Sequence, residues 1–214
     1  MEAIKSIAEF FLHIDKHLNV VIQNCGGWSY GILFIIVFAE TGLVVTPFLP
    51  GDSLLFAAGT FAAIGSFNIV SVFLVLFAAA VVGDSVNYFI GKKIGEGIFT
   101  KDSRFFKKEY LERTHKFYEK YGGKTIVLAR FVPIIRTFAP FVAGVGKMSY
   151  GYFFFYNVIG AFLWVAVFVG GGFFFGNIPL IKENFSIVIF IIIFVSILPP
   201  VIEFVKHHKI NRKG

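Results

Sequence analysis

The sequence predicts an all-α polytopic membrane protein with about three spanning helices, two facing re-entrant helical hairpins in an inverted repeat, and amphipathic surface helices. Composition is the first observation: 57% of the 214 residues are hydrophobic and only 15% are charged, whereas a soluble domain is about 25% charged. The second observation is that long uncharged runs alternate with short basic segments. A soluble globular enzyme, a disordered chain and a disulfide scaffold are therefore excluded.

The spanning helices follow from the lengths of the uncharged runs, because a bilayer core needs roughly 20 apolar residues in a helix. We expect spans at about 68–92, 150–175 and 184–205. The N-terminal segment, residues 1–27, has mixed polarity and is expected to lie on the membrane surface. Residues 103–121 carry aromatic residues close to helical spacing, which predicts an amphipathic helix on the cytoplasmic surface. A solvated linker helix fits that last pattern equally well.

Two further apolar stretches, at about 28–65 and 124–147, do not fit an unbroken spanning helix. Each has prolines and charges near its middle, and neither is easily tolerated in a helix that faces lipid. A helix–break–helix hairpin that enters and leaves on one side keeps the irregular backbone inside protein or a watery cavity. Two kinked spanning helices are the alternative. The residues that support the two breaks are Pro47, Pro50, Gly51, Pro133 and Pro140.

The same order of elements occurs twice: a broken hairpin, a short polar link and a spanning helix. Ala58-Gly59 and Ala143-Gly144 stand at similar positions in the two hairpins. Residue identity between the halves is weak, so the repeat rests mainly on the order of its elements. Broken segments in corresponding halves are typical of transporters with a site at the membrane midplane.

Orientation follows from the lysines and arginines, which gather in residues 92–124 and in the C-terminal tail. The positive-inside rule places both segments in the cytoplasm, and the two hairpins then dip from opposite sides and meet tip to tip. The chain accordingly divides into an N-terminal amphipathic segment (1–27), a membrane transport domain (28–176), and a C-terminal spanning helix with a basic cytoplasmic tail (177–214).

Two arginines stand in the second hairpin, where an ionisable residue is a functional hypothesis by default. Arg130 and Arg136 would point about 120° apart on one continuous helix, but the break at Pro133 lets both turn toward one cavity. Two guanidinium groups in a dry site favour an anion, and phosphate fits their forked donors. The alternative is that they only pair with Glu40 and Asp52 inside the hairpins.

The intramembrane carboxyl groups have different local contexts. Glu40 ends an apolar run where a capping role is not expected, so we interpret it as a proton carrier. Asp52 starts the returning helix of the first hairpin, where a proton-coupling role and an N-cap role fit equally well.

A third carboxyl group, Asp84, shares a helix face with Asn87 and Tyr88. Its expected role is hydrogen bonding between helices. Asn157 and Trp164 are interpreted in the same way, as packing and interface residues.

The sequence lacks the residues that several kinds of site usually require. The single Cys25 excludes an internal disulfide, no histidine lies in a spanning segment, and there is no phosphate-loop glycine pattern. We therefore expect no enzyme, no cofactor and no metal site. The net charge of +7 is concentrated in a few polar segments, which favours membrane orientation over nucleic-acid binding.

Three motifs resemble the signatures of the DedA family of bacterial membrane proteins, over about residues 28–176. The combination is specific because the charged positions agree in every motif. The matching residues are Phe38–Gly42 with Pro47–Leu55, then Gly83–Tyr88 with Gly91 and Gly95, then Arg130–Pro140 with Ala143, Gly144 and Met148, completed by Asn157, Gly160 and Trp164.

The resemblance implies two facing re-entrant hairpins in a multi-pass protein of the bacterial cytoplasmic (inner) membrane. It also implies proton-motive-force-dependent transport of lipid phosphates, notably undecaprenyl phosphate during carrier-lipid recycling. The essential residues of the family match Glu40 and Asp52, expected to couple protons, and Arg130 and Arg136, expected to bind phosphate.

The expected partners are membrane lipids and protons, and a homo-oligomer is left open. Three alternatives to a lipid-phosphate flippase stay open as well. They are a phosphatidylethanolamine scramblase or flippase, a small-ion or proton antiporter, and a structural scaffold.

Overall fold

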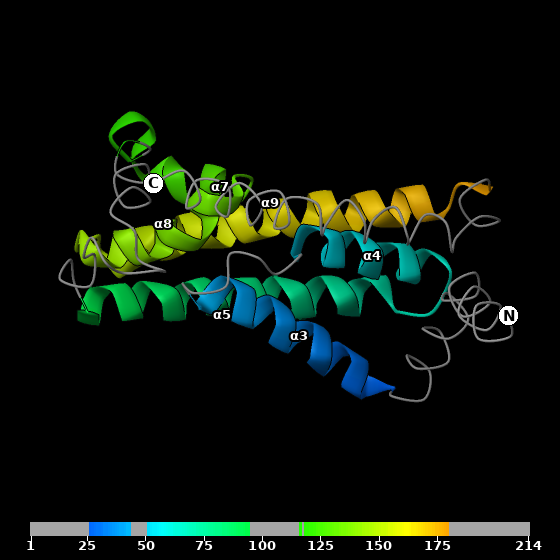
Figure 1. Cartoon of the computed structure of the whole chain (residues 1–214). Coiled ribbons are helices and arrows are strands. Elements are labelled where there is room, and N and C mark those ends of the chain that lie inside the picture. The colour runs from blue at the N-terminus through cyan, green and yellow to red at the C-terminus, as the bar shows by residue number, and fades with distance from the viewer. Residues whose placement is uncertain (1–25, 44–50, 95–115, 117, 180–214) are drawn as a thin grey trace, which may run out of the picture. The chain divides into compact units, whose positions relative to one another are not determined.

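All regular structure in the described part of the chain is helical, as the sequence predicts. The computed structural model describes residues 26–43, 51–94, 116 and 118–179 (Figure 1), and no strand occurs among them. The expected surface segment at 1–27, most of the expected amphipathic helix at 103–121, and the expected third span at 184–205 lie outside the described residues.

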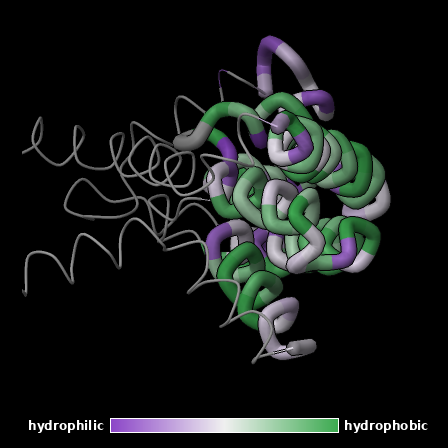
Figure 2. Tube along the Cα trace, turned by 90° about the vertical axis from the view of Figure 1, so that its right-hand side faces the viewer, coloured by the Kyte–Doolittle hydropathy of each residue, from purple (hydrophilic) through white to green (hydrophobic). Residues whose placement is uncertain are grey.

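Two of the predicted spanning helices are confirmed as long apolar helices. Helix α5 covers Ile69–Ile94 and helix α9 covers Tyr150–Gly176, and both are long and apolar enough to cross a membrane. At 1.5 Å per residue each is about 40 Å long. Large apolar side chains remain exposed on α9, including Phe155 at 60% and Phe174 at 70%, and hydrophobic residues dominate the described helices in Figure 2. Such exposed surfaces suit a lipid environment rather than water.

The first expected hairpin contains two separate helices. Helix α3 covers Gly27–Gly42 and helix α4 covers Gly51–Ala63. Pro47 and Pro50 fall between them, outside the described residues.

The second expected hairpin shows its break directly. A short 3₁₀ turn, η2 (Gly122–Lys124), leads into helix α7 (Thr125–Ala129), and helix α8 then covers Pro133–Val145. Val132 is extended, with φ −121° and ψ 104°, because the residue before a proline is pushed out of the helical region.

The two prolines of this hairpin act differently. Pro133 begins α8, where a missing N–H is not needed, whereas Pro140 lies inside α8 and the helix continues past it. The predicted helix–break–helix is thus observed at residues 130–132, and its re-entrant course in a membrane stays a prediction.

The chain forms two compact units, and α5 and α9 contribute residues to both. Unit 1 contains residues 1–29, 50–72 and 168–214, and unit 2 contains residues 30–49 and 73–167. Each unit is described by itself below.

Within unit 1, α4 packs closely against the C-terminal part of α9. A side chain at Gly59 would collide with the backbone of Val169 and Phe173, and one at Gly172 would collide with the carbonyl group of Phe56. Small residues let two helix backbones approach this closely in a membrane protein.

Within unit 2, α8 packs against α5 through a similar contact. Gly144 lies against the carbonyl group of Tyr88, and Gly91 lies against the carbonyl group of Phe141. The Tyr88 side chain is fully buried and stacks on Phe153 of α9, with 4.6 Å between the ring centroids. Unit 2 therefore has a tight core to which α5, α8 and α9 contribute, and the predicted site residues Glu40, Arg130 and Arg136 lie in this unit.

Candidate functional site

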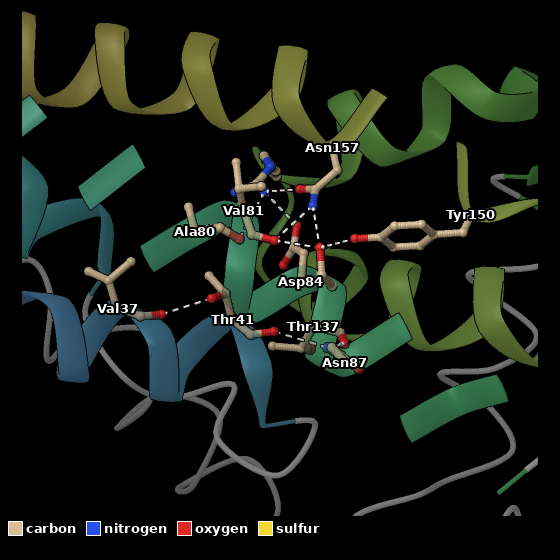
Figure 3. A network of polar contacts seen from close by, with 11 residues as sticks. Val37, Thr41, Ala80, Val81, Asp84, Asn87, Thr137, Tyr150 and Asn157 are labelled. Atoms are coloured by element: carbon tan, nitrogen blue, oxygen red, sulfur yellow. Dashed lines mark hydrogen bonds and ion pairs between the residues drawn. The ribbon is translucent and has the colours of Figure 1, made fainter. Parts of the chain in front are cut away.

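One face of α5 carries the polar residues that organise the site in unit 2. Asp84, Asn87, Tyr88 and Gly91 follow the spacing i, i+3, i+4, i+7, which places them on one side of a helix. Asp84, Asn87 and Tyr88 are all buried. Figure 3 shows Asp84 and Asn87 pointing from α5 toward partners on other elements.

Arg130, at the break after α7, forms a buried ion pair with Asp84. The Nη2 atom of Arg130 lies 2.5 Å from Oδ2 of Asp84, and the two side chains are 1% and 3% exposed. The same nitrogen donates to Oδ1 of Asn157 at 2.7 Å and approaches the carbonyl oxygen of Ala80 at 3.5 Å. The expected interhelical role of Asp84 is therefore observed, and its partner is one of the two predicted phosphate-binding arginines.

Gly160 of α9 makes room for the Arg130 side chain. A β-carbon at position 160 would lie 3.2 Å from both Cδ and Nε of Arg130. The Nε and Nη1 atoms of Arg130 and the Oδ1 atom of Asp84 are buried and have no hydrogen-bond partner among the described residues. Arg130 therefore keeps donor capacity beyond its ion pair, inside an environment where an unpaired donor is costly.

Arg136 of α8 forms a second buried ion pair, with Glu40 of α3. Nη2 of Arg136 donates to Oε1 of Glu40, and the side chains are 6% and 0% exposed. These residues are 96 positions apart in the sequence. In the sequence analysis, this pairing is the alternative to phosphate binding by the arginine.

Trp164 of α9 brings the two arginines to one aromatic ring. The guanidinium carbon of Arg130 lies 5.7 Å from the Trp164 ring centroid, and that of Arg136 lies 5.3 Å from it. The indole is fully buried, so both contacts lie within the range of cation–π attraction without competing water. Both arginines thus turn toward one place despite their six-residue spacing.

Asn157 of α9 connects this cluster to the backbone of α5. Its Nδ2 atom donates to the carbonyl oxygen of Val81 at 3.0 Å and approaches Oγ of Ser85 at 3.4 Å, while its Oδ1 atom accepts from Arg130. The Tyr150 hydroxyl donates to the same Ser85 oxygen at 3.3 Å. Asn157 therefore has the interface role that the sequence predicts.

Asn87 and Tyr88 make contacts that sequence reasoning missed. The Nδ2 atom of Asn87 donates to the carbonyl oxygens of Thr41 at 3.1 Å and Thr137 at 2.9 Å, and the Tyr88 hydroxyl donates to the carbonyl oxygen of Met148. The sequence signal that could have revealed these contacts is that both residues lie on the same helix face as Asp84.

Tyr118, which precedes the hairpin, forms a similar contact. Its hydroxyl donates to the carbonyl oxygen of Ala139 at 2.9 Å. Burial, with a smaller contribution from the Asp84 carboxylate, raises the pKa of Tyr118, so its phenol stays a neutral donor.

Asp52 belongs to unit 1, whereas the site residues described above belong to unit 2. It is half-buried and stands in the first turn of α4, directly after the buried Gly51. The helix begins at Gly51, so Asp52 lies inside the helix rather than at the expected N-cap. A carboxylate in the first turn is favoured by the helix dipole.

The four buried charges among the described residues of unit 2 cancel. Two guanidinium groups face two carboxylates, each ion pair joins different elements, and one indole contacts both cations. Within the described residues, no three His, Cys, Asp or Glu side chains gather as metal ligands. The chemistry available here is the binding of an anion and the exchange of protons on carboxyl groups.

Comparison with known proteins identifies the family. The family model described as the VTT domain matches residues 49–174. The chain is 55% identical to protein DedA of Escherichia coli strain K12 over 212 residues, which covers 98% of this chain and 97% of DedA. The chain is a member of the DedA family.

Other relatives of this DedA family protein are also membrane proteins by name. It is 46% identical over 187 residues to the uncharacterized membrane protein Rv0364 of Mycobacterium tuberculosis strain H37Rv, covering 86% of this chain and 82% of the relative. It is 32% identical over 155 residues to the inner membrane protein YqjA of Escherichia coli strain K12, covering 72% and 70%. No solved structure gives a significant match.

Proposed function

We propose that this DedA family member is a proton-motive-force-dependent lipid-phosphate flippase, with undecaprenyl phosphate as the leading substrate. One observation supports the proposal above others: two buried arginines of the second hairpin contact a single indole, and each is paired with a carboxylate from another helix. Forked guanidinium donors match a phosphate head group, and Arg130 and Arg136 are the residues proposed to hold it.

Charge balance is the reason to couple transport to protons. The cluster is neutral as it stands, and a phosphate monoester adds between one and two negative charges near pH 7. An uncompensated charge in a dry site is costly, so a carboxylate has to release its arginine by taking up a proton. Glu40 is the proposed carrier for Arg136, and Asp52 of α4 is proposed as a second proton-coupling residue.

The cycle has a defined direction. Acid on the outer face protonates the carboxyl group and frees an arginine to accept the head group. The higher pH inside returns the carboxylate to its arginine and releases the lipid. The gradient would therefore drive lipid phosphate inward, as carrier-lipid recycling requires.

Flipping of a fluorescent polyprenyl phosphate in proteoliposomes tests the proposal. The initial rate should rise when the outer side is acidified, for protein oriented as in the cell, and a protonophore should remove that acceleration. Glu40→Gln and Arg136→Ala should abolish transport in folded protein. Glu119→Gln is the matched control, because it neutralises an exposed glutamate outside the cluster, and it should transport normally.

Three outcomes would redirect the proposal. Flipping that ignores the gradient in the wild type indicates a passive scramblase. Faster flipping of phosphatidylethanolamine than of polyprenyl phosphate assigns a phospholipid substrate. Proton or cation flux without lipid movement indicates an antiporter.

A structural scaffold is the second candidate, and the pairing of both arginines with carboxylates favours it. If the charges only join helices, Arg136→Ala should lower the yield of folded protein, because an orphaned buried charge costs about 3–5 kcal/mol. If they form the transport site, transport is lost while folded protein remains. Measuring yield and flipping on the same preparations separates the two candidates.

The proposed orientation places the basic segment at 92–124 and the C-terminus in the cytoplasm. In a Cys25→Ser background, cysteines at Arg104 and Ile210 should react with an impermeant reagent only from the cytoplasmic side, and a cysteine at Ile178 should react from outside. If Arg104 and Ile210 react from opposite sides, the proposed topology is wrong.

A further inference from the structure

Asn87 contacts the backbone beside both members of the Glu40–Arg136 pair. Its Nδ2 atom donates to the carbonyl oxygen of Thr41, the residue after Glu40, and to that of Thr137, the residue after Arg136. The two acceptors come from α3 and α8, which carry the carboxylate and the guanidinium group respectively. A single amide nitrogen therefore joins the two backbones that carry the pair, as Figure 3 shows.

The two acceptors lie at different places in their helices. Thr41 lies in the last turn of α3, where the final carbonyl groups have no intrahelical N–H partner. In α8, Pro140 has no N–H to offer the carbonyl group of Arg136 four residues earlier, and its ring crowds that group. The carbonyl group freed by Pro140 is thus that of Arg136, and Asn87 binds α8 one residue later, at Thr137.

The geometry leaves little freedom for α3 to slide past α8. The two hydrogen bonds measure 3.1 and 2.9 Å and share one nitrogen, so a relative shift of roughly 0.5 Å lengthens one of them beyond good geometry. Asn87 is fully buried, so breaking these hydrogen bonds would leave buried polar groups without water to replace them, at a large cost in free energy. Close approach of Gly42 to Gly83 adds a second contact between α3 and α5.

The same helix face serves the other ion pair. Asp84, three residues before Asn87, binds Arg130. Among the described residues, the charged groups near Glu40 include Arg136, its direct partner, and Arg130, which contacts the same indole as Arg136 and is paired with Asp84. Whatever moves α3 or α8 relative to α5 changes how closely Glu40 and Arg136 face each other.

We propose that Asn87 is a positioning residue that fixes the register of α3 against α8 and so sets the strength of the Glu40–Arg136 pair. Its part in transport rests on the proposed flippase function, whereas its effect on helix register does not. Asn87 acts through the backbone beside the pair and does not touch the proposed substrate.

Removing the side-chain donors tests the proposal in two separable ways. Asn87→Leu keeps a similar volume without donors, and Asn87→Ser keeps a single donor. Asn177→Leu is the matched control: Asn177 also donates its amide to a carbonyl group, that of Phe173, but it is exposed at the end of α9. Size-exclusion profiles establish that each variant is folded.

The first measurement is the distance between α3 and α8 by spin labels, in a Cys25→Ser background. Labels replace Leu43 and Lys147, which are exposed next to the ends of the two helices. Asn87→Leu should broaden or shift the distance distribution, Asn87→Ser should do so less, and Asn177→Leu should leave it unchanged. An unchanged distribution in folded Asn87→Leu overturns the positioning role.

The second measurement is proton-driven flipping of polyprenyl phosphate in proteoliposomes. Asn87→Leu should lower the initial rate roughly fivefold, the equivalent of about 1 kcal/mol, and should weaken its dependence on the imposed gradient, with Asn87→Ser in between. Normal gradient dependence in Asn87→Leu contradicts a role in coupling. If the wild type does not flip the lipid, the proposed function fails, while the spin-label distances still decide the role of Asn87 in helix register.

Discussion

Two helix contacts, one in each unit, are built in the same way. They are the glycine contact of α4 with α9 in unit 1 and that of α8 with α5 in unit 2. In unit 1, Gly59 lies against the carbonyl group of Val169. In unit 2, Gly144 lies against the carbonyl group of Tyr88. Each contact has a reciprocal partner, in which a glycine of the long helix lies against a phenylalanine carbonyl of the short helix.

The correspondence extends to residue spacing. Gly59 and Gly144 are 85 positions apart, as are Phe56 and Phe141, while Tyr88 and Val169 are 81 apart, as are Gly91 and Gly172. Constant spacing on both sides of the contact supports the internal repeat that the order of elements predicts.

The difference lies in the charges that surround the contact. The α9 position that corresponds to Asp84 is Val165, and the α4 position that corresponds to Arg136 is Gly51. The backbone contact therefore needs no charge to form. Within the described residues, the comparison separates a packing device common to both units from a polar cluster that lies beside the unit 2 contact.

The largest expected effect comes from breaking the polar cluster. Asp84→Leu leaves Arg130 buried without its carboxylate, and we expect the free energy of unfolding to fall by about 3–5 kcal/mol, measured by SDS titration in detergent micelles. Asp84→Leu combined with Arg130→Met should recover most of that loss, because both charges are gone, and should still not transport. Full stability in Asp84→Leu alone would mean that the ion pair is not structural.

A smaller effect is expected at the shared contact. Gly59→Ala and Gly144→Ala each place a methyl group against a helix backbone, and each should cost about 1–3 kcal/mol of unfolding free energy. The two losses should be similar. Gly170→Ala is the control, because a β-carbon there meets nothing within 4 Å, and it should be neutral. A large loss at one glycine with none at the other would contradict the equivalence of the two contacts.

The smallest effect on stability is expected at Gly160. A methyl group there meets Cδ and Nε of Arg130 and the Cα atom of Val127, each at 3.2 Å. These contacts are tight without being clashes, so Gly160→Ala should cost about 1 kcal/mol or less. The corresponding α5 residue is already Ala79. Flipping should fall more than stability does, and equal losses in both would show that Gly160 serves packing alone.

Local patterns predicted much of the fold. The lengths of the uncharged runs predicted α5 and α9, and Pro133 predicted the break between α7 and α8. The turn of both arginines toward one place also followed from that break. The first hairpin could be predicted only as two helices with a break, and its prolines lie outside the described residues.

The partner of Arg130 could not be predicted in the same way. Asp52 and Asp84 are both carboxylates in apolar stretches, and choosing between them requires the rotation and depth of α5 against the second hairpin. Asn87 was missed for a related reason: a single amide in an apolar helix has no periodic signal, and its acceptors are carbonyl groups, which every residue possesses.

The α5 face from Asp84 to Gly91 has a consequence for how the family tolerates changes in chain length. Within two helical turns it binds Arg130, the end of α3 at Thr41, α8 at Thr137, and the backbone at Phe141 and Met148. One inserted or deleted residue there would rotate every later side chain by 100° about the helix axis and separate these contacts from one another. Alignments of relatives should therefore contain no gap between positions 84 and 91, and insertions should gather in the connections between helices.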